Sequence, residues 1–303
     1  AGAYADLTLH LLPGVDLAPS VRVDEYHPSA GLRGEDSFAF DPKLAARVAL
    51  SRRITWVSTL GIAHQEPSYV VPIPGVRVFS NNGLQKVYSL SQGVELRLPW
   101  DLKARLTGFL NDDRDVTDFV AACGALLQCS SVASVDGHTY GLEVLIERAL
   151  TNRLGGWLSY TLSRAERTVN DVAYLSPFDR THVLSAVLHY DLGRGYGAGV
   201  RGTYYSGRPD IPTFVFSNQS PSFAFGPGQI SQHRLPDYYR FDARVDKRWT
   251  FGGRRWLAVA AEFFDATLTK EAVDYKCNFL TRVCTAQYVG PIALPSIGVE
   301  AGF

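Results

Sequence analysis

The side chains best able to do chemistry in this sequence are its four cysteines and seven histidines. The cysteines form two close pairs, Cys123 with Cys129 and Cys277 with Cys284, inside loop-like segments. An even number of cysteines in close pairs predicts two local disulfides and an oxidising compartment. The alternative is one metal ion held by four thiolates, but each pair is spaced more widely than the usual Cys-x-x-Cys.

The histidines are scattered, and their spacing does not predict a metal site. The sequence contains no HExxH pattern, no Gly-x-Ser-x-Gly turn and no glycine-rich phosphate loop. Asp112, Asp113, Asp115 and Asp118 form an acidic cluster that would attract Ca²⁺, although a solvated loop is the simpler interpretation. We therefore predict neither an enzyme nor a bound metal or cofactor.

Charged residues recur at every second position of otherwise apolar segments. In residues 241–246, Phe241, Ala243 and Val245 alternate with Asp242, Arg244 and Asp246. A period of two is the pattern of a β-strand with one apolar face and one wet face. The same pattern recurs along the chain, and it predicts that one set of charges shares the wet side of a sheet: Arg22, Asp24, Arg47, Glu95, Arg97, Lys103, Arg105, Glu143, Glu147, Arg201, Asp242, Arg244 and Asp246.

The connections between these strands alternate between short and long. Tight turns are predicted at 13–16, 51–53, 99–101, 150–154, 192–195 and 251–254, because most of these carry Gly, Pro, Asn or Asp. Longer polar or Pro-rich segments lie at 27–42, 65–84, 116–136, 168–178, 208–236 and 267–293. Six hairpins and a last strand give about thirteen antiparallel strands, an all-β fold.

Strand length and loop asymmetry favour a membrane barrel over a soluble β-sandwich. Many strands reach the length of about nine residues that a tilted strand needs to cross a bilayer. Short turns at one end and long loops at the other are typical of bacterial outer-membrane barrels. The charges listed above would then line a lumen, either as ion-pair ladders or in contact with a substrate. Aromatic girdles are expected near the strand ends: Trp56, Trp157, Tyr160, Tyr190, Tyr204, Tyr205, Trp249, Trp256 and Phe264.

Several segments resemble the barrel domain of TonB-dependent outer-membrane receptors. These are Ser-Pro-Phe-Asp-Arg-Thr-His at 176–182, the strand and exit loop at 199–209, the strand at 235–248, and the C-terminal aromatic residue Phe303. Two positions depart from the family pattern: residues 264–267 read Phe-Asp-Ala-Thr instead of Asn-x-x-Asn, and Ala301 replaces a frequent Tyr.

The resemblance implies a partial barrel over residues 1–303, without the plug domain of that family. The family's barrel has about twenty-two strands, so the strands here correspond to the tenth through the last. The lack of any Met also predicts a fragment or a processed chain. The last strand, with Ile297, Val299, Ala301 and Phe303, is the expected signal for the outer-membrane assembly machinery.

The function implied by the resemblance is energy-coupled uptake of a scarce nutrient, such as an iron–siderophore, cobalamin or a glycan. The expected partners are outer-membrane lipid and, through the plug, a TonB-type energy-transducing protein. Phe214, Phe216, Phe223 and Phe225 are candidates to grip an apolar ligand in a long outer loop. Alternatives are a passive porin-like channel or a scaffold barrel of an envelope complex. No basic run predicts nucleic-acid binding.

Overall fold

The computed structural model describes residues 1–26, 36–65, 84–118, 133–169, 172–209, 215–217, 220–222, 234–252, 255–278 and 283–302. Within these ranges every regular element is a β-strand. A search of the same ranges for a helix long and apolar enough to cross a membrane found none.

One large antiparallel sheet dominates the molecule. Its strands follow the order β1-β3-β4-β5-β6-β7-β8-β9-β11-β12-β15-β16-β19, with β2 paired to β3 and β10 paired to β9. The main path confirms the expected thirteen strands. Their bounds are β1 (Gly2–Asp6), β2 (Leu9–Leu12), β3 (Val15–Tyr26), β4 (Ser37–Ala49), β5 (Ile54–Gln65), β6 (Gln85–Arg97), β7 (Leu102–Asp118), β8 (Ala133–Asn152), β9 (Leu154–Val169), β10 (Val172–Leu175), β11 (His182–Gly193), β12 (Tyr196–Tyr205), β15 (Tyr238–Thr250), β16 (Trp256–Phe264) and β19 (Leu294–Gly302).

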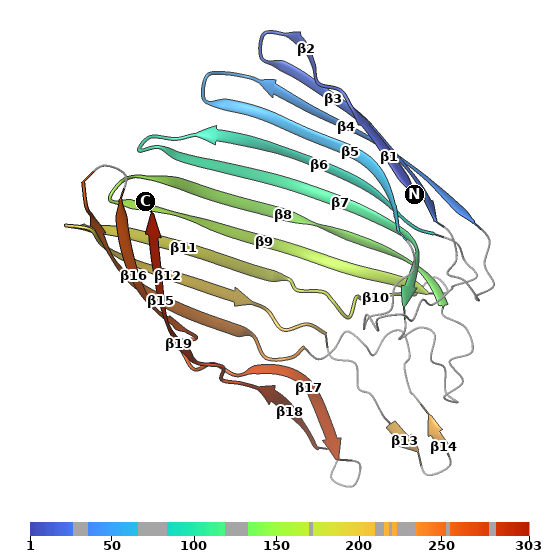
Figure 1. Cartoon of the computed structure of the whole chain (residues 1–303). Coiled ribbons are helices and arrows are strands. Elements are labelled where there is room, and N and C mark those ends of the chain that lie inside the picture. The colour runs from blue at the N-terminus through green and yellow to red at the C-terminus, as the bar shows by residue number, and fades with distance from the viewer. Residues whose placement is uncertain are drawn as a thin grey trace.

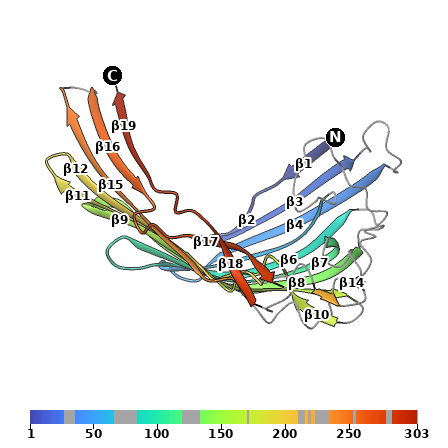
Figure 2. The same ribbon diagram turned by 90° about the horizontal axis from the view of Figure 1, so that it is seen from below.

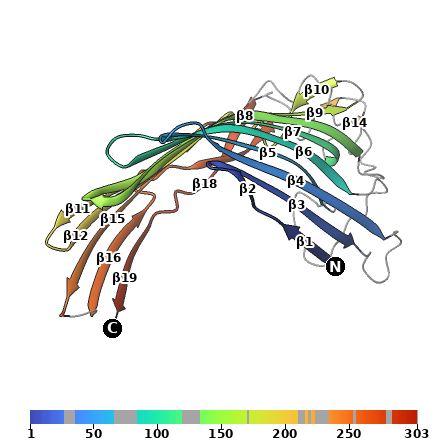
Figure 3. The same ribbon diagram turned by 90° about the horizontal axis from the view of Figure 1, so that it is seen from above.

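The sheet is strongly curved and forms an open trough with β1 along one edge and β19 along the other (Figures 2 and 3). Short turns gather at one end of the strands, and the long connections leave from the opposite end (Figure 1). β1 begins near the long-connection end and β19 finishes near the short-turn end, as an odd number of strands requires (Figure 1).

The strand registers assign every side chain to one of two faces, because directly opposed residues point to the same side of a sheet. We call the side that carries Asp242, Arg244 and Asp246 the polar face and the opposite side the apolar face. Few apolar side chains of the described residues are buried. Phe241 and Val245 on the apolar face are each 54% exposed, so this row does not pack against a second layer of the described protein.

The strands extend further at the long-connection end than the sequence pattern indicates. β4 already begins at Ser37, and β7 and β8 reach Asp118 and Ala133, which lie within segments predicted to be loops. Two further hairpins lie inside predicted loops: β13 (Val215–Ser217) with β14 (Ser220–Ser222), and β17 (Glu271–Asn278) with β18 (Val283–Val289). Beyond the apolar belt, backbone pairing and ion pairs between charged side chains maintain the hairpins, so the period-of-two signal is lost before the strands end.

Candidate functional site

All thirteen charged residues predicted to share the wet side of the sheet lie on the polar face. The registers connect them strand by strand. For example, Arg201 opposes Asp242 between β12 and β15, and Lys103 opposes Glu147 between β7 and β8. Arg105 likewise opposes Glu95 between β7 and β6. The polar face is therefore the only face on which these side chains can interact with one another or with a common partner.

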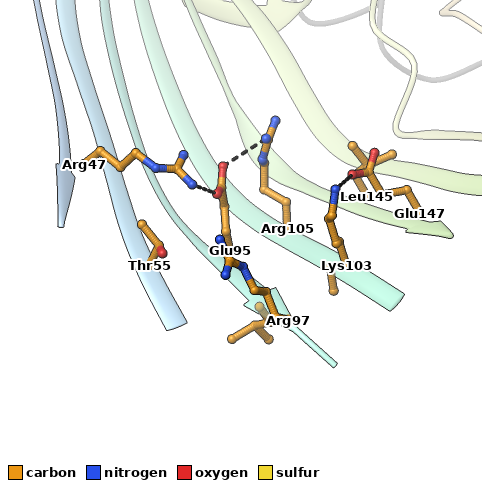
Figure 4. A pocket seen from close by; sticks show the side chains of 10 residues that line it. Arg47, Thr55, Glu95, Arg97, Lys103, Arg105, Leu145 and Glu147 are labelled. Atoms are coloured by element: carbon orange, nitrogen blue, oxygen red, sulfur yellow. Dashed lines mark hydrogen bonds and ion pairs between the residues drawn. The ribbon is translucent and has the colours of Figure 1, made fainter. Parts of the chain in front are cut away.

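A three-residue ion-pair ladder crosses the polar face near the short turns (Figure 4). Glu95 accepts hydrogen bonds from the guanidinium groups of Arg47 and Arg105, the latter at 2.9 Å. Arg47 lies on β4 and Glu95 on β6, so the contact passes over β5. The neighbouring β5 position opposite Glu95 is Thr55, whose short side chain leaves room for this contact. The ladder thus ties together strands that share no backbone hydrogen bonds.

A cavity of about 250 Å³ adjoins this ladder and contains more basic than acidic side chains. Lys103 lies 3.6 Å from Glu147, and both side chains are largely exposed. Arg97 has no ion-pair partner among the described residues. The cavity can therefore attract an anionic group, although its exposed charges are partly screened by water.

Replacing Glu95 by glutamine is expected to lower the free energy of unfolding by about 1 kcal/mol, because Arg47 and Arg105 would then share no acidic partner. Glu143→Gln is a matched control on the same face, since Glu143 has no ion-pair partner among the described residues. Denaturant titration of both variants in lipid vesicles measures the difference. Equal losses would show that the ladder contributes nothing to stability.

A second set of ion pairs crosses β12, β15 and β16. Asp242 binds Arg201 at 2.6 Å and Arg240 at 3.1 Å. Arg244 contacts Glu262 on β16 and lies 3.5 Å from Asp246 on its own strand. A cavity of about 280 Å³ lies beside these pairs. Here the charges of opposite sign nearly balance, in contrast to the first cavity.

A cluster that the sequence analysis did not single out joins the β17–β18 hairpin to the long-connection end of the polar face. The Tyr205 hydroxyl donates to Glu271 at 2.6 Å, and the Arg180 guanidinium lies 3.8 Å from the centre of the Tyr205 ring. Tyr238 stacks on Tyr205 with ring centres 4.9 Å apart. Arg208 donates to the backbone oxygen of Val273 in the same hairpin. Sequence alone gave no signal for this cluster, because its members come from four distant segments.

The segment 176–182 is organised around one buried carboxylate. Asp179 is 1% exposed, and it accepts hydrogen bonds from the Ala165 backbone at 2.7 Å and from Arg234 at 2.5 Å. It thereby joins β9, the connection before β11, and the segment before β15. Asp179 belongs to the Asp-Arg-Thr-His motif that resembles the family pattern. In the structure this carboxylate fixes the long-connection end of the sheet.

The acidic cluster Asp112, Asp113, Asp115 and Asp118 is not a solvated loop, because all four residues belong to β7. Asp112 binds Arg114 at 2.7 Å, and Asp113 binds Arg167 at 3.0 Å. Asp112 and Asp113 are consecutive strand residues and therefore point to opposite faces. No group of three or more potential metal ligands occurs in the part of the chain that the structure describes.

The predicted aromatic girdle is only partly correct. Trp56, Tyr160, Tyr190, Tyr204 and Trp249 lie on the apolar face, whereas Trp157, Tyr205, Trp256 and Phe264 lie on the polar face. Arginines stack on two of the polar-face rings, since Arg248 lies 4.1 Å from the Trp256 ring and Arg240 lies 4.0 Å from the Phe264 ring. An aromatic residue near a strand end can therefore lie on either face, because alternate positions along a strand point to opposite faces of the sheet.

The structure describes only some of the remaining predicted site residues. Cys277 and Cys284 are directly opposed in the β17–β18 hairpin, whereas Cys123 and Cys129 lie outside the described residues. Both disulfides therefore stay predictions.

Of the candidate ligand-binding phenylalanines, the structure describes only the backbone of Phe216, in β13. Phe214, Phe223 and Phe225 lie outside the described residues. Ile297, Val299 and Ala301 follow one another along the apolar face of β19, and Phe303 lies outside the described residues.

Several solved structures of bacterial uptake receptors are similar to this chain. The ferric-catecholate import receptor Fiu from E. coli K12 is 14% identical, with a TM-score of 0.66 over 99% of this chain and 44% of the receptor. The ferric yersiniabactin uptake receptor FyuA from Yersinia pestis is 15% identical, with a TM-score of 0.65 over 100% of this chain and 45% of the receptor. The ferripyoverdine receptor of the outer membrane of Pseudomonas aeruginosa is 14% identical, with a TM-score of 0.68 over 99% of this chain and 38% of the receptor.

These similarities establish the fold, and the chain spans less than half the length of each of these receptors. No curated protein matches the sequence. The family model described as "TonB dependent receptor-like, beta-barrel" matches residues 1–269. Because this match covers most of the sequence and agrees with the observed sheet, the chain belongs to the TonB-dependent receptor-like β-barrel family.

Proposed function

We propose that the chain forms part of the wall of an outer-membrane barrel, with its apolar face toward lipid and its polar face toward the lumen. The observation that carries this proposal is the division between the two faces. Exposed apolar side chains such as Leu142, Val245 and Ile297 lie on one face, and the ion-pair ladders lie on the other. Charged side chains in contact with hydrocarbon would cost several kcal/mol, whereas in a lumen they can pair or be hydrated.

The edges of the sheet support a larger closed barrel. β1 and β19 would each present unpaired backbone groups, and such groups have no partners within a bilayer. In the proposed receptor, further strands close the barrel between these edges, and a plug domain fills the lumen. The row of Ile297, Val299, Ala301 and Phe303 serves as the signal for the outer-membrane assembly machinery.

The proposed activity is energy-coupled uptake of a scarce nutrient, with an iron chelate as the first candidate. Family membership supports a transport receptor, and the three similar structures named above are receptors for iron chelates or their complexes. The cluster of Tyr205 and Tyr238, with Arg180 stacked on Tyr205 and 3.7 Å from Glu271, offers aromatic rings and a partly compensated cation to an aromatic ligand. A TonB-type protein supplies the energy through the plug.

An uptake assay distinguishes this function from that of a passive channel. Cells that express the intact receptor are expected to accumulate a radiolabelled iron chelate, and deletion of the TonB-type protein is expected to abolish the accumulation. Cobalamin and oligosaccharides, tested in parallel, identify the ligand class. Uptake that persists without the energy-transducing protein and rises linearly with ligand concentration would favour the porin-like alternative.

A further inference from the structure

Arginines mark the short-turn end of the sheet. Arg52 and Arg53 lie in the turn between β4 and β5, Arg153 between β8 and β9, Arg194 between β11 and β12, and Arg255 before β16. All five are exposed, and none forms an ion pair with an acidic residue in the described ranges. Arg153 and Arg194 occupy left-handed backbone positions, with φ angles of 63° and 53°, at the sharpest bends of their turns.

The arginines at the opposite end of the apolar face are neutralised within the chain. Arg114 lies 2.7 Å from Asp112 and 2.9 Å from Asp136. Arg164 lies 2.7 Å from Glu166. The two ends of the sheet therefore differ, because these turn arginines have no acidic partner among the described residues, whereas Arg114 and Arg164 do. These exposed arginines are therefore available to bind an anionic group.

Two of the turns lie side by side and form a compact basic patch, which we define as Arg153, Arg194 and Lys247. The Asp191 backbone donates to the backbone oxygen of Arg153 at 2.5 Å, and the Lys247 ammonium donates to the backbone oxygen of Arg194. These contacts hold the backbones of the two turns and the Lys247 side chain close together, while the exposed Asp191 carboxylate accepts a hydrogen bond from the Gly193 backbone on the polar side.

An aromatic row borders this basic patch on its apolar side. The Lys247 ammonium lies 3.9 Å from the centre of the Tyr196 ring and 5.7 Å from that of Trp249. Tyr190 and Trp249 are both 41% exposed on the apolar face. Aromatic and cationic side chains thus lie together at the short-turn end of the sheet, next to the aliphatic part of the apolar face, and this combination is typical of the headgroup region of a membrane.

We infer that the basic patch binds the phosphates of anionic phospholipids in the leaflet at the short-turn end. Guanidinium groups match phosphate oxygens in charge and geometry, and their position beside the aromatic row sets them at headgroup level. The inference rests on the proposed membrane location and adds a lipid preference to it. The lipid phosphates would pair with these arginines and would fix the depth of the barrel.

The test compares protein purified from outer membranes and reconstituted into vesicles of phosphatidylcholine, alone or mixed with phosphatidylglycerol. Anionic lipid is expected to raise the unfolding temperature by several degrees, and added salt is expected to reduce this rise. In the Arg153→Gln/Arg194→Gln variant the rise is expected to fall by at least half. The matched control Arg97→Gln/Lys103→Gln removes two charges from the polar face at the same end and is expected to retain the full rise.

The outcomes separate the lipid inference from the membrane proposal. Insertion into both vesicle types with equal unfolding temperatures would overturn the lipid inference alone. Failure to insert into either type would overturn the barrel proposal on which it rests. An equal rise caused by inorganic phosphate in phosphatidylcholine vesicles would assign the arginines to soluble anions, which also overturns the inference. Nutrient uptake is measured separately and is not used as a readout.

Discussion

Replacing Asp179 by alanine is expected to lower the free energy of unfolding by roughly 3 kcal/mol, because a buried ion pair would lose one partner. The substitution leaves the Arg234 guanidinium without its carboxylate and the Ala165 backbone N–H without its acceptor. Both groups belong to segments that join at the long-connection end of the sheet. Denaturant-induced unfolding in lipid vesicles, followed by tryptophan fluorescence, measures the loss.

Two further variants test whether burial and charge cause the effect of Asp179→Ala. Asp179→Asn retains an acceptor for Ala165 but removes the negative charge, so we expect an intermediate loss. Asp191→Ala removes an exposed carboxylate that accepts a hydrogen bond of 2.8 Å from the Gly193 backbone N–H. We expect this variant to lower the free energy of unfolding by about 1 kcal/mol or less. If Asp179→Ala were no more harmful than Asp191→Ala, the buried carboxylate would not hold these segments together.

The sheet could be predicted from the sequence because lipid and water impose opposite requirements on alternate residues. A shift by one residue in a strand such as β15 would expose Asp242 and Arg244 to the apolar side, so the alternation is strictly maintained. The positions of all six tight turns and the order of the strands follow from this pattern. The same alternation predicts that the thirteen charged residues share one face of the sheet.

The long-connection end could not be predicted in the same way, because strands such as β7 carry charged side chains on both faces there. In β7 the consecutive residues Asp112 and Asp113 each find an arginine partner, but on opposite faces, so the alternation disappears while the strand continues. The Arg47–Glu95 contact depends on a register between strands separated by β5, and a single sequence contains no record of that register. The same holds for Tyr205 and Glu271, which are 66 residues apart.

The most direct test of the two-face assignment uses adjacent residues of β9. Leu158 is central in the apolar run of this strand, and Ser159 points to the polar face. Leu158→Arg is expected to lower the free energy of unfolding in vesicles by about 2–4 kcal/mol, because the charge would enter hydrocarbon. Ser159→Arg introduces the same side chain one residue later, and because this position lies on the polar face we expect a loss below about 1 kcal/mol.

The folded fraction of each variant can be followed by its resistance to heating in detergent on a gel, and the free energy by urea titration in vesicles. The contrast does not depend on strand propensity, because both variants place arginine in the same strand.

A soluble sandwich with its core on the Leu158 side would also be destabilised by arginine at this position. The unfolding measurement is therefore paired with a partition assay. A β9 face that contacts lipid requires that the wild-type protein enter the vesicle fraction and that Leu158→Arg reduce this entry. A protein that stays in the aqueous phase with a normal fold would show that the exposed Leu158 row meets water, and the proposed lumen on the opposite face would then have no membrane to cross.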